Sequence, residues 1–348
     1  MTNVGLVPEP AQKVVSRPAG PLVLGGDLGG TSTRILIASH DGTVVGRGSA
    51  GGGNPTSHPA SAAAALGQAL RQALAGIDPA TVGAAVIGAA GGSALTKPEV
   101  RAQFDAAWSG VGLTCRADYI GDLEVAFASG TSEPDGTVLI AGTGSAAGTV
   151  VDHRLTRTAD GHGWLLGDDG SGFWLGREAV RSVLRALDLG ESTGPLATAV
   201  IAALLPDGGG APSPERPGFS PLRDDLVRAA NSQPPVMLAA LARTVVTAYD
   251  AGDATAQALV KRAAELLTET VSRIRSADDT RPLVLAGSVA GENSPVGQAL
   301  RKAIHDRFAG EVRTARDGVG GATWLALSTL NPTLATPTSH TKLTQPST

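Results

Sequence analysis

A short glycine-rich turn follows the first apolar run of the chain and begins with Asp27. Gly29 and Gly30 let backbone N–H groups approach a ligand closely, and the hydroxyls of Thr31 and Thr33 add donors. Such a turn suits phosphate oxygens. Asp27 is a candidate to hold Mg²⁺ through water, because Mg²⁺ bound with nucleotide phosphates needs only one or two protein carboxylates. From this stretch alone, an ordinary β-hairpin with Asp27 as a turn residue remains the alternative.

A second turn of the same kind lies about 115 residues further on. Residues 138–151 combine an apolar strand, the turn residues Gly142, Thr143, Gly144 and Ser145, and a second apolar strand. Self-similarity of this kind predicts a repeated structural unit. Two phosphate-type turns in two similar units are harder to attribute to coincidence than one. Neither turn matches the GxxxxGK[ST] P-loop or a GxGxxG that leads into a helix.

Asp122 follows a predicted strand and precedes a predicted helix. A carboxylate at the entrance to a cleft between two units is placed to accept a proton from an alcohol that attacks a phosphoryl group. Capping of the helix is the alternative role. Glu124 is a second acidic candidate, but its position in the helix predicts that it faces solvent.

The segment 161–180 has too many glycines for a regular element and is expected to be a shaped loop that leads into a helix. Its adjacent acids, Asp168 and Asp169, are candidates to bind a metal or sugar hydroxyls. Alternatively, Asp169 or Ser171 caps the helix that follows. Asn54 lies in an Asn-Pro turn, and its amide is a candidate to bind a polar group of a substrate.

Composition and charge exclude several classes of protein. The chain has 348 residues, which suggests about two domains with sizeable cores. Its 28 basic and 32 acidic side chains give a net charge of -4 without a basic block, so a nucleic-acid partner is not expected. The single cysteine, Cys115, excludes a disulfide framework, a four-cysteine zinc site and an iron–sulfur cluster held by this chain alone. The sequence has no secretory signal and no long apolar run, which predicts a soluble cytoplasmic protein that does not enter a membrane.

Strand and helix patterns place the two turns at corresponding points of two units. The expected elements are hairpin strands over 21–50, a helix over 61–77, a strand over 81–92, a helix over 99–111, a strand over 115–122, strands from 136, helices over 176–188, 236–250, 254–276 and 294–308, a strand over 282–287 and a closing helical segment over 318–330. Residues 206–221 are expected to form a surface loop. Residues 1–20 and the Thr-, Ser- and Pro-rich tail over 331–348 are expected to be disordered.

These motifs together resemble those of the sugar-kinase, actin and Hsp70 ATPase superfamily. The likeness runs from about Leu22 to Leu330 and is closer to the BadF/BadG/BcrA-type branch, which includes N-acetylglucosamine kinases and glucosamine kinases. The two turns resemble the first and second phosphate motifs of that family. The segment LAGSVA resembles its adenosine motif, with Gly287 and Ser288 against the nucleoside, and GDDGS resembles its sugar-binding GDEGS segment.

The resemblance implies roles for single residues. Asp122 matches the catalytic aspartate, Asn54 and Asp168 match sugar-binding positions, and Ser145 of the second turn is an implied sugar contact. The implied fold class is α/β, with two ribonuclease-H-like (actin-like ATPase) lobes and an interlobe cleft. The implied division gives the N-terminal lobe residues 21–121 plus 317–330 and the C-terminal lobe residues 122–316.

The implied activity is that of an ATP-dependent amino-sugar kinase, which phosphorylates N-acetylglucosamine or glucosamine at the 6-hydroxyl with ATP and Mg²⁺. The resemblance also allows a homodimer. Two departures from the family pattern leave the sugar open: Asp169 replaces the usual glutamate, and Ala146 stands where animal N-acetylglucosamine kinases have a sugar-contacting asparagine. The alternatives are a partner-coupled ATPase of the same superfamily, a kinase of another hexose, and a sugar sensor without activity.

Overall fold

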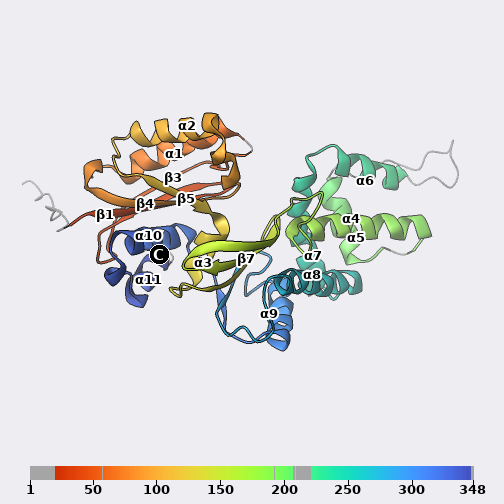
Figure 1. Ribbon diagram of the computed structural model, residues 1–348. Coiled ribbons are helices and arrows are strands. Elements are labelled where there is room, and N and C mark those ends of the chain that lie inside the picture. The colour runs from red at the N-terminus through yellow and green to blue at the C-terminus, as the bar shows by residue number, and fades with distance from the viewer. Residues whose placement is uncertain (1–19, 57, 192, 207, 209–220, 346–348) are drawn as a thin grey trace, which may run out of the picture.

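Two five-stranded sheets with one shared strand order form the centre of this computed structural model, which describes residues 20–56, 58–191, 193–206, 208 and 221–345 (Figure 1). The order is β3-β2-β1-β4-β5 in the first sheet and β8-β7-β6-β9-β10 in the second. The first sheet contains β1 (Leu22–Leu28), β2 (Thr33–Ala38), β3 (Val44–Ala50), β4 (Val82–Ala89) and β5 (Ala117–Gly121). The second contains β6 (Gly136–Ala141), β7 (Ser145–Val151), β8 (Arg154–Asp160), β9 (Leu283–Ala286) and β10 (Val312–Thr314).

Each sheet begins as an antiparallel meander and continues with parallel strands. β1 pairs antiparallel with β2, and β2 pairs antiparallel with β3, whereas β4 and β5 run parallel to β1. β6 takes the place of β1 in the second sheet, with the same strand directions around it. The predicted internal repeat and the predicted α/β fold with two ribonuclease-H-like lobes are therefore confirmed. We call the part built on the first sheet the first lobe and the part built on the second sheet the second lobe.

Helices cover both faces of the first sheet. α1 (Pro59–Ala73) and α2 (Pro98–Ser109) pack on one face, and α10 (Gly318–Leu330) packs on the other. Side chains of β1 alternate between these two cores, because successive residues of a strand point to opposite faces: Leu24 packs toward α1 and Val23 toward α10. A Cβ atom at Gly25 would lie 2.3 Å from the backbone N of Thr323, so glycine there lets α10 lie directly on β1.

The helices of the second lobe form its larger core. They are α4 (Gly172–Leu189), α5 (Pro195–Leu204), α6 (Pro221–Asn231), η3 (Pro235–Leu241), α7 (Ala242–Asp250), α8 (Ala254–Ser272) and α9 (Pro295–Arg307). Ser171 caps α4 by accepting a hydrogen bond from the N–H of Trp174 at 3.2 Å, so the capping role considered for Ser171 is confirmed. Asp253 caps α8 in the same way and also accepts from the N–H of Leu196 at 3.0 Å, which ties α8 to α5.

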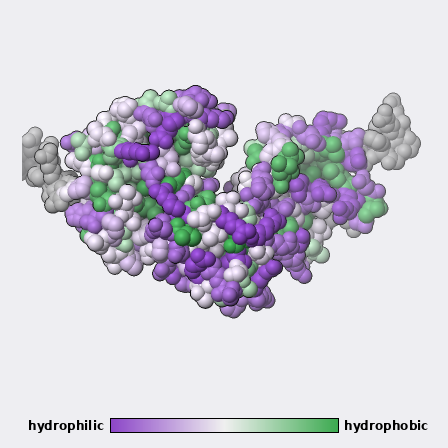
Figure 2. All heavy atoms as spheres, in the orientation of Figure 1, coloured by the Kyte–Doolittle hydropathy of each residue, from purple (hydrophilic) through white to green (hydrophobic). Residues whose placement is uncertain are grey.

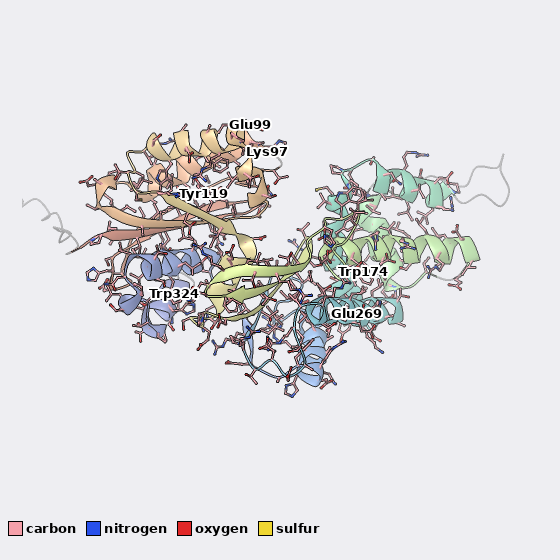
Figure 3. The ribbon with its side chains drawn as sticks, viewed as in Figure 1. Lys97, Glu99, Tyr119, Trp174, Glu269 and Trp324 are labelled. Atoms are coloured by element: carbon pink, nitrogen blue, oxygen red, sulfur yellow. The ribbon has the colours of Figure 1, made fainter. Side chains whose placement is uncertain are left out.

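Two connections hold the lobes together. α3 (Asp122–Gly130) packs against α10 of the first lobe and against β6 and β7 of the second. Trp324 of α10, labelled in Figure 3, is in contact with the second lobe. Its ring lies edge-on to that of His153 in the turn between β7 and β8, with ring centroids 5.2 Å apart. Arg154, the next residue, pairs with Asp118 of the first lobe at 2.5 Å. The residue at which one lobe gives way to the other stays a prediction.

The C-terminal segment differs from the expectation. Residues 331–345 are not disordered in the structure but form η4 (Pro332–Leu334) and α11 (Pro337–Thr344). Thr336 and Ser339 form a capping box at the start of α11, and Leu343 is buried against α10. The Thr- and Ser-rich composition is typical of disordered segments. Composition does not take account of the order of the residues, and here that order forms a capping box at the start of a helix. Residues 1–19, most of the predicted loop 206–221 and residues 346–348 lie outside the described residues.

None of the described helices is both long and apolar enough to cross a membrane.

Candidate active site

Asp27 stands near the end of β1 and pairs with Arg34, which also pairs with the distant Asp317. Arg34 lies directly opposite on β2, and its Nη2 donates to Asp27 Oδ2. Nη1 of the same guanidinium donates to Asp317 Oδ1 at 2.8 Å. A Cβ atom at Gly318 would lie 2.9 Å from Asp27 Oδ2, so the N-terminus of α10 begins against this carboxylate. The helix dipole there favours a negative charge.

The turn after Asp27 is a closed hairpin between β1 and β2. The N–H of Gly29 donates to the carbonyl of Ser32 at 2.8 Å, which closes the turn. Gly30 and Thr31 are exposed at its tip. Thr33 is fully buried instead, and its hydroxyl lies under Gly53, where an added Cβ atom would come within 2.4 Å. Its hydroxyl therefore does not reach the surface of the hairpin.

Asp122 is the first residue of α3, at the carboxyl end of β5. The capping role belongs to Glu124, because its Oε2 accepts from the N–H of Gly121 at 2.8 Å. Glu124 also accepts from the N–H of Leu155 and is buried, so the prediction that it faces solvent was wrong. Asp122 accepts from the adjacent N–H of Leu123 at 3.0 Å and interacts with its own backbone N–H, but no side chain that the structure describes donates to it. Its carboxylate is thus left open to a ligand.

The surroundings of Asp122 perturb its acidity. Asp122 is exposed to solvent and lines a concave region of the surface. Burial raises the pKa of the Asp122 carboxyl, the N–H of Leu123 opposes this, and the negative charges of Asp27 and Glu124 raise it further. A carboxylate with a raised pKa is a stronger base once it has lost its proton.

A cavity of about 430 Å³ opens at Asp122, and its wall includes Gly91, Gly92 and Ser93 after β4. Asn54 lies beside this wall, since a Cβ atom at Gly91 would come within 2.8 Å of Asn54 Oδ1. These residues meet because β1, β4 and β5 are parallel and all end at one edge of the sheet.

The second turn joins three segments of the second lobe. The N–H of Gly142 donates to the carbonyl of Gly144 at 2.9 Å, and the N–H of Gly172, the first residue of α4, donates to the carbonyl of Gly142 at 2.8 Å. Gly287 has φ +90°, and a Cβ atom there would lie 2.3 Å from the carbonyl oxygen of Ala141. Only glycine fits this position. The turn after β9, with Ser288, therefore lies directly against the turn that contains Thr143.

Asp168 lies against the second turn rather than apart from it. Its Oδ1 accepts from the N–H of Ser145 at 2.9 Å, and its φ of +60° is in the left-handed region. Burial raises the pKa of the Asp168 carboxyl, the N–H of Ser145 opposes this, and the charges of Asp160 and Asp169 raise it further. Ser145 and Asp168 are thus held side by side.

Asp160 organises this arrangement, although the sequence analysis did not single it out. Its carboxylate accepts from the N–H groups of Asp168 at 2.9 Å and Asp169 at 3.3 Å. It also accepts from the hydroxyl of Ser145 at 3.3 Å. The side chain is only 7% exposed and stands at φ +62°, just before Gly161. The Asp-Gly pair was the available signal, but an Asp-Gly pair also marks ordinary turns.

The predicted site residues therefore fall into two groups. Those of the first lobe (Asp27, Gly29, Gly30, Thr31, Asn54 and Asp122) lie at the carboxyl edge of its parallel strands. Those of the second lobe (Gly142, Thr143, Gly144, Ser145, Asp168, Gly287 and Ser288) lie at the corresponding edge of the second sheet. Figure 2 shows a notch between the part that carries β1–β5 and the part that carries α4–α8.

The described acidic side chains of the site are candidates to bind a metal ion. Among the described side chains, no group of three His, Cys, Asp or Glu residues is close enough to hold a metal ion by itself. Asp27 nevertheless suits Mg²⁺ bound with nucleotide phosphates, because its Oδ1 accepts no hydrogen bond from the described residues.

The chain resembles known proteins in sequence. A sequence model of the BadF/BadG/BcrA/BcrD ATPase family matches residues 24–326. An N-acetylmuramic acid/N-acetylglucosamine kinase of Clostridium acetobutylicum is 37% identical over 76 residues, which are 21% of this chain and 24% of that protein. The match therefore spans about a quarter of that relative.

Two solved structures share the fold. A candidate N-acetylglucosamine kinase from Chromobacterium violaceum has a TM-score of 0.67 and 24% identity, covering 89% of this chain and 100% of that chain. A second candidate N-acetylglucosamine kinase, from Porphyromonas gingivalis, has a TM-score of 0.64 and 23% identity, covering 90% and 99%. At these identities the likeness establishes the shared two-lobed fold.

Proposed function

Because the chain belongs to the BadF/BadG/BcrA/BcrD ATPase family, we propose that it is an ATP-dependent amino-sugar kinase. It transfers the γ-phosphoryl group to the 6-hydroxyl of N-acetylglucosamine or glucosamine. The observation that carries the proposal is the open carboxylate of Asp122, which has a raised pKa and lies at the edge of the first lobe beside the cavity wall. As ATP is the donor, the proposal includes a cytoplasmic location.

Asp122 acts as the general base. It accepts the proton of the sugar hydroxyl as the oxygen attacks phosphorus, and the developing negative charge leaves with ADP. Its hydrogen bond to the N–H of Leu123 fixes one carboxylate oxygen, so the other is free to orient the hydroxyl. Positioning matters here because phosphoryl transfer depends mostly on alignment and electrostatics.

The two turns bind the phosphates of ATP through backbone N–H groups. Gly29, Gly30 and Thr31 contribute from the first lobe, and Gly142, Thr143 and Gly144 contribute from the second. Thr33 was assigned to this group from the sequence, and its burial suggests that it supports the hairpin from below. Gly287 and Ser288 lie against the nucleoside, and the close approach of Gly287 to Ala141 and Gly142 supports this placement. Asp27 would hold Mg²⁺ through water, and the bound ion would supply positive charge against the phosphates.

The sugar contacts come from both lobes. Asn54 contributes an amide from the first lobe, and Ser145 and Asp168 contribute from the second. Asp160 holds Ser145 and Asp168 in their relative places. We assign residues 21–121 and 317–330 to the first lobe and 122–316 to the second. Closure of the lobes then excludes water from the reacting groups.

Coupled ADP release from the purified protein tests the proposal. ATP and Mg²⁺ are supplied with N-acetylglucosamine, glucosamine, glucose, N-acetylmannosamine or no sugar. A rate that rises by orders of magnitude with one amino sugar supports the kinase and identifies its substrate. A rate that is the same with every sugar and with the blank would favour the partner-coupled ATPase.

The Asp122→Asn variant tests the role of the base. We expect its rate with the best sugar to fall by at least about 100-fold, since a general base contributes at least that much, with nucleotide affinity unchanged. Asp105→Asn on α2, an exposed acid in an ion pair with Arg101, is the matched control. A near-normal rate for Asp122→Asn would remove that residue from the mechanism.

A further inference from the structure

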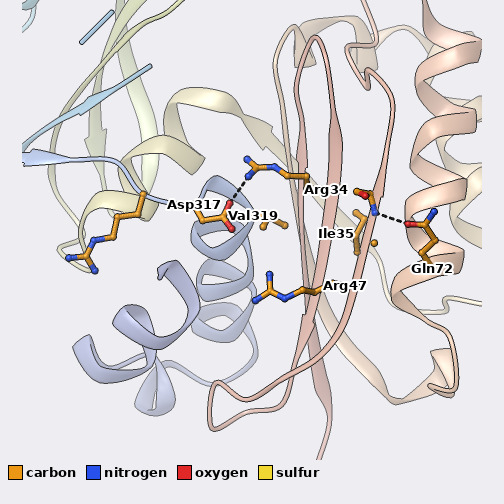
Figure 4. A pocket seen from close by; sticks show the side chains of 9 residues that line it. Arg34, Ile35, Arg47, Gln72, Asp317 and Val319 are labelled. Carbon is orange, nitrogen blue, oxygen red and sulfur yellow. Dashed lines mark hydrogen bonds and ion pairs between the residues drawn. The ribbon is translucent and has the colours of Figure 1, made fainter. Parts of the chain in front are cut away.

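A cavity of about 620 Å³ lies beside the edge strand β3, outside the residues assigned to catalysis or substrate binding. Its wall comes from β2, β3, α1 and the start of α10, including Arg34, Arg47, Ser49, Gln72, Arg316 and Asp317 (Figure 4). Arg34 and Arg47 both extend from the β2–β3 hairpin toward α10, on either side of Val319 (Figure 4). The cavity is therefore bounded by two guanidinium groups that approach from the same sheet.

The wall of this cavity is positively charged, whereas the protein as a whole is negatively charged. The chain carries a net charge of -4, whereas three arginines face one acid, Asp317, around the cavity. Arg34 is partly neutralised because it pairs with Asp27 and Asp317. Arg47 and Arg316 are exposed and form no ion pair with any residue that the structure describes. The cavity thus has positive charge that the protein itself does not neutralise.

The two guanidinium groups fit an anionic ligand. Gln72 lies on the other side of the strands, on α1, where its side-chain oxygen accepts from the N–H of Ser49 at 2.9 Å, so the donors on the α10 side are those of Arg34 and Arg47 (Figure 4). Guanidinium groups bind phosphate oxygens through two parallel N–H donors, so they recognise a phosphate better than a chloride or a single carboxylate oxygen. The volume is ample for a phosphate monoester with a small organic group.

We propose that this cavity binds a phosphorylated small molecule, with Arg47 as its main cationic ligand and Arg34 as a second. The site is separate from the two phosphate-type turns. A sugar phosphate and free inorganic phosphate offer the same dianionic group, and the experiment below distinguishes them.

Arg34 connects this cavity with Asp27. One guanidinium donates to Asp27 and to Asp317, so a phosphate that draws Arg34 toward itself competes with both carboxylates. Occupation of the cavity then changes the charge around Asp27 and with it the affinity for Mg²⁺ and ATP, and by linkage ATP changes the affinity for the phosphate compound by the same factor. This second step rests on the proposed ATP site, whereas phosphate binding does not.

Calorimetric titration of the full chain tests the binding step, with inorganic phosphate and glucose 6-phosphate as the two probes. We expect at least one probe to bind below about 10 mM, and Arg47→Ala to weaken that binding about tenfold or more. Arg47→Lys keeps the positive charge but lacks the two parallel N–H donors of a guanidinium group. Its affinity for the probe is therefore expected to lie between that of the parent and that of Arg47→Ala. Arg185→Ala on α4, another exposed arginine, is the matched control and should bind as the parent does.

Hydrogen exchange locates the bound probe. Protection is expected over 44–50 and 316–320, with none at 29–31 or 142–145. Tighter binding of glucose 6-phosphate than of inorganic phosphate would identify the organic part as recognised, and equal binding would identify the phosphate group alone. Absence of binding, equal affinity in Arg47→Ala and the parent, or protection confined to the two turns would overturn the proposal.

The coupling step has its own measurement. The affinity for ATP with Mg²⁺ is determined with and without the tighter probe, in the parent and in Arg47→Ala. We expect the probe to shift the ATP affinity of the parent and to leave that of the variant unchanged. A protein that binds the probe but shows no kinase activity would refute the proposed function and leave the phosphate site intact.

Discussion

The buried carboxylate of Asp160 offers a sharp test of how the second lobe holds its proposed sugar contacts. Replacement by asparagine keeps the shape and tolerates the left-handed backbone, whose φ is +62°. The change therefore isolates the negative charge. One oxygen becomes an NH₂ group, which donates and no longer accepts.

The hydrogen bonds of Asp160 determine how much the free energy of unfolding should fall. The amide oxygen can still accept from the N–H of Asp168, and the hydroxyl of Ser145 can turn to accept from the new NH₂ group. The N–H of Asp169, now facing a donor, loses its acceptor in a place where the side chain of residue 160 is only 7% exposed. Loss of a hydrogen bond to a charged group costs about 1.5–3 kcal/mol, so we expect the free energy of unfolding to fall by about 2 kcal/mol.

Urea denaturation and sugar kinetics measure the two consequences. The proposed sugar contacts depend on the same hydrogen bonds, so the KM for the sugar should rise about tenfold with ATP affinity unchanged. Asp152→Asn is the matched control, since Asp152 also has positive φ, at +50°, but is exposed in the turn between β7 and β8. If both variants lost less than about 0.5 kcal/mol, a typical surface effect, and kept the parent KM, the organising role of Asp160 would be refuted.

Two further predictions concern stability. Asp122→Asn should unfold at higher urea concentration than the parent at pH 7, because the pKa of Asp122 is raised in the folded protein and its charged form costs stability above that pKa. This gain in stability should vanish near about pH 3, where the carboxyl is protonated in both the folded and the unfolded protein. An equal gain at both pH values would contradict this explanation. Gly287→Ala should cost about 2–4 kcal/mol, because the new Cβ atom would lie 2.3 Å from the carbonyl oxygen of Ala141 at a backbone φ of +90°. Gly190→Ala has positive φ but open space around it, so a cost of about 1 kcal/mol is expected there, and equal costs in the two glycine variants would show that the close contact does not matter.

Several features of the site depended on contacts that no local pattern specifies. Arg34 and Asp317 are 283 residues apart and meet beside Asp27 only because α10 returns to cover the first sheet. Glu124 was expected in solvent from its place on a helix, yet it is buried and accepts a hydrogen bond from the N–H of Leu155 in β8. Asp160 likewise gains its partners from a loop that folds back over it.

The structure of the C-terminal segment was likewise not predictable from its composition. Its polar residues suggested disorder, but His340 is buried, with Nε2 2.7 Å from the carbonyl oxygen of Ala128 and its ring edge-on to Trp324. A helix of eight residues has little stability by itself, so its presence depends on the surface of α10 that it covers.

The sequence by itself determined the strands other than β10, the two glycine turns and the repeat that relates them. These follow from alternation of apolar residues and from the backbone freedom of glycine, which are properties of neighbouring residues. It also located Asp27, which precedes a glycine turn, Asp122, which follows a strand, and Asp168, which lies in a glycine-rich loop. The tertiary structure alone decided which strand lies beside which, which carboxylates are left open, and which are used by the protein itself. Those outcomes depend on groups that are distant in the chain and become neighbours only when the sheets and helices pack.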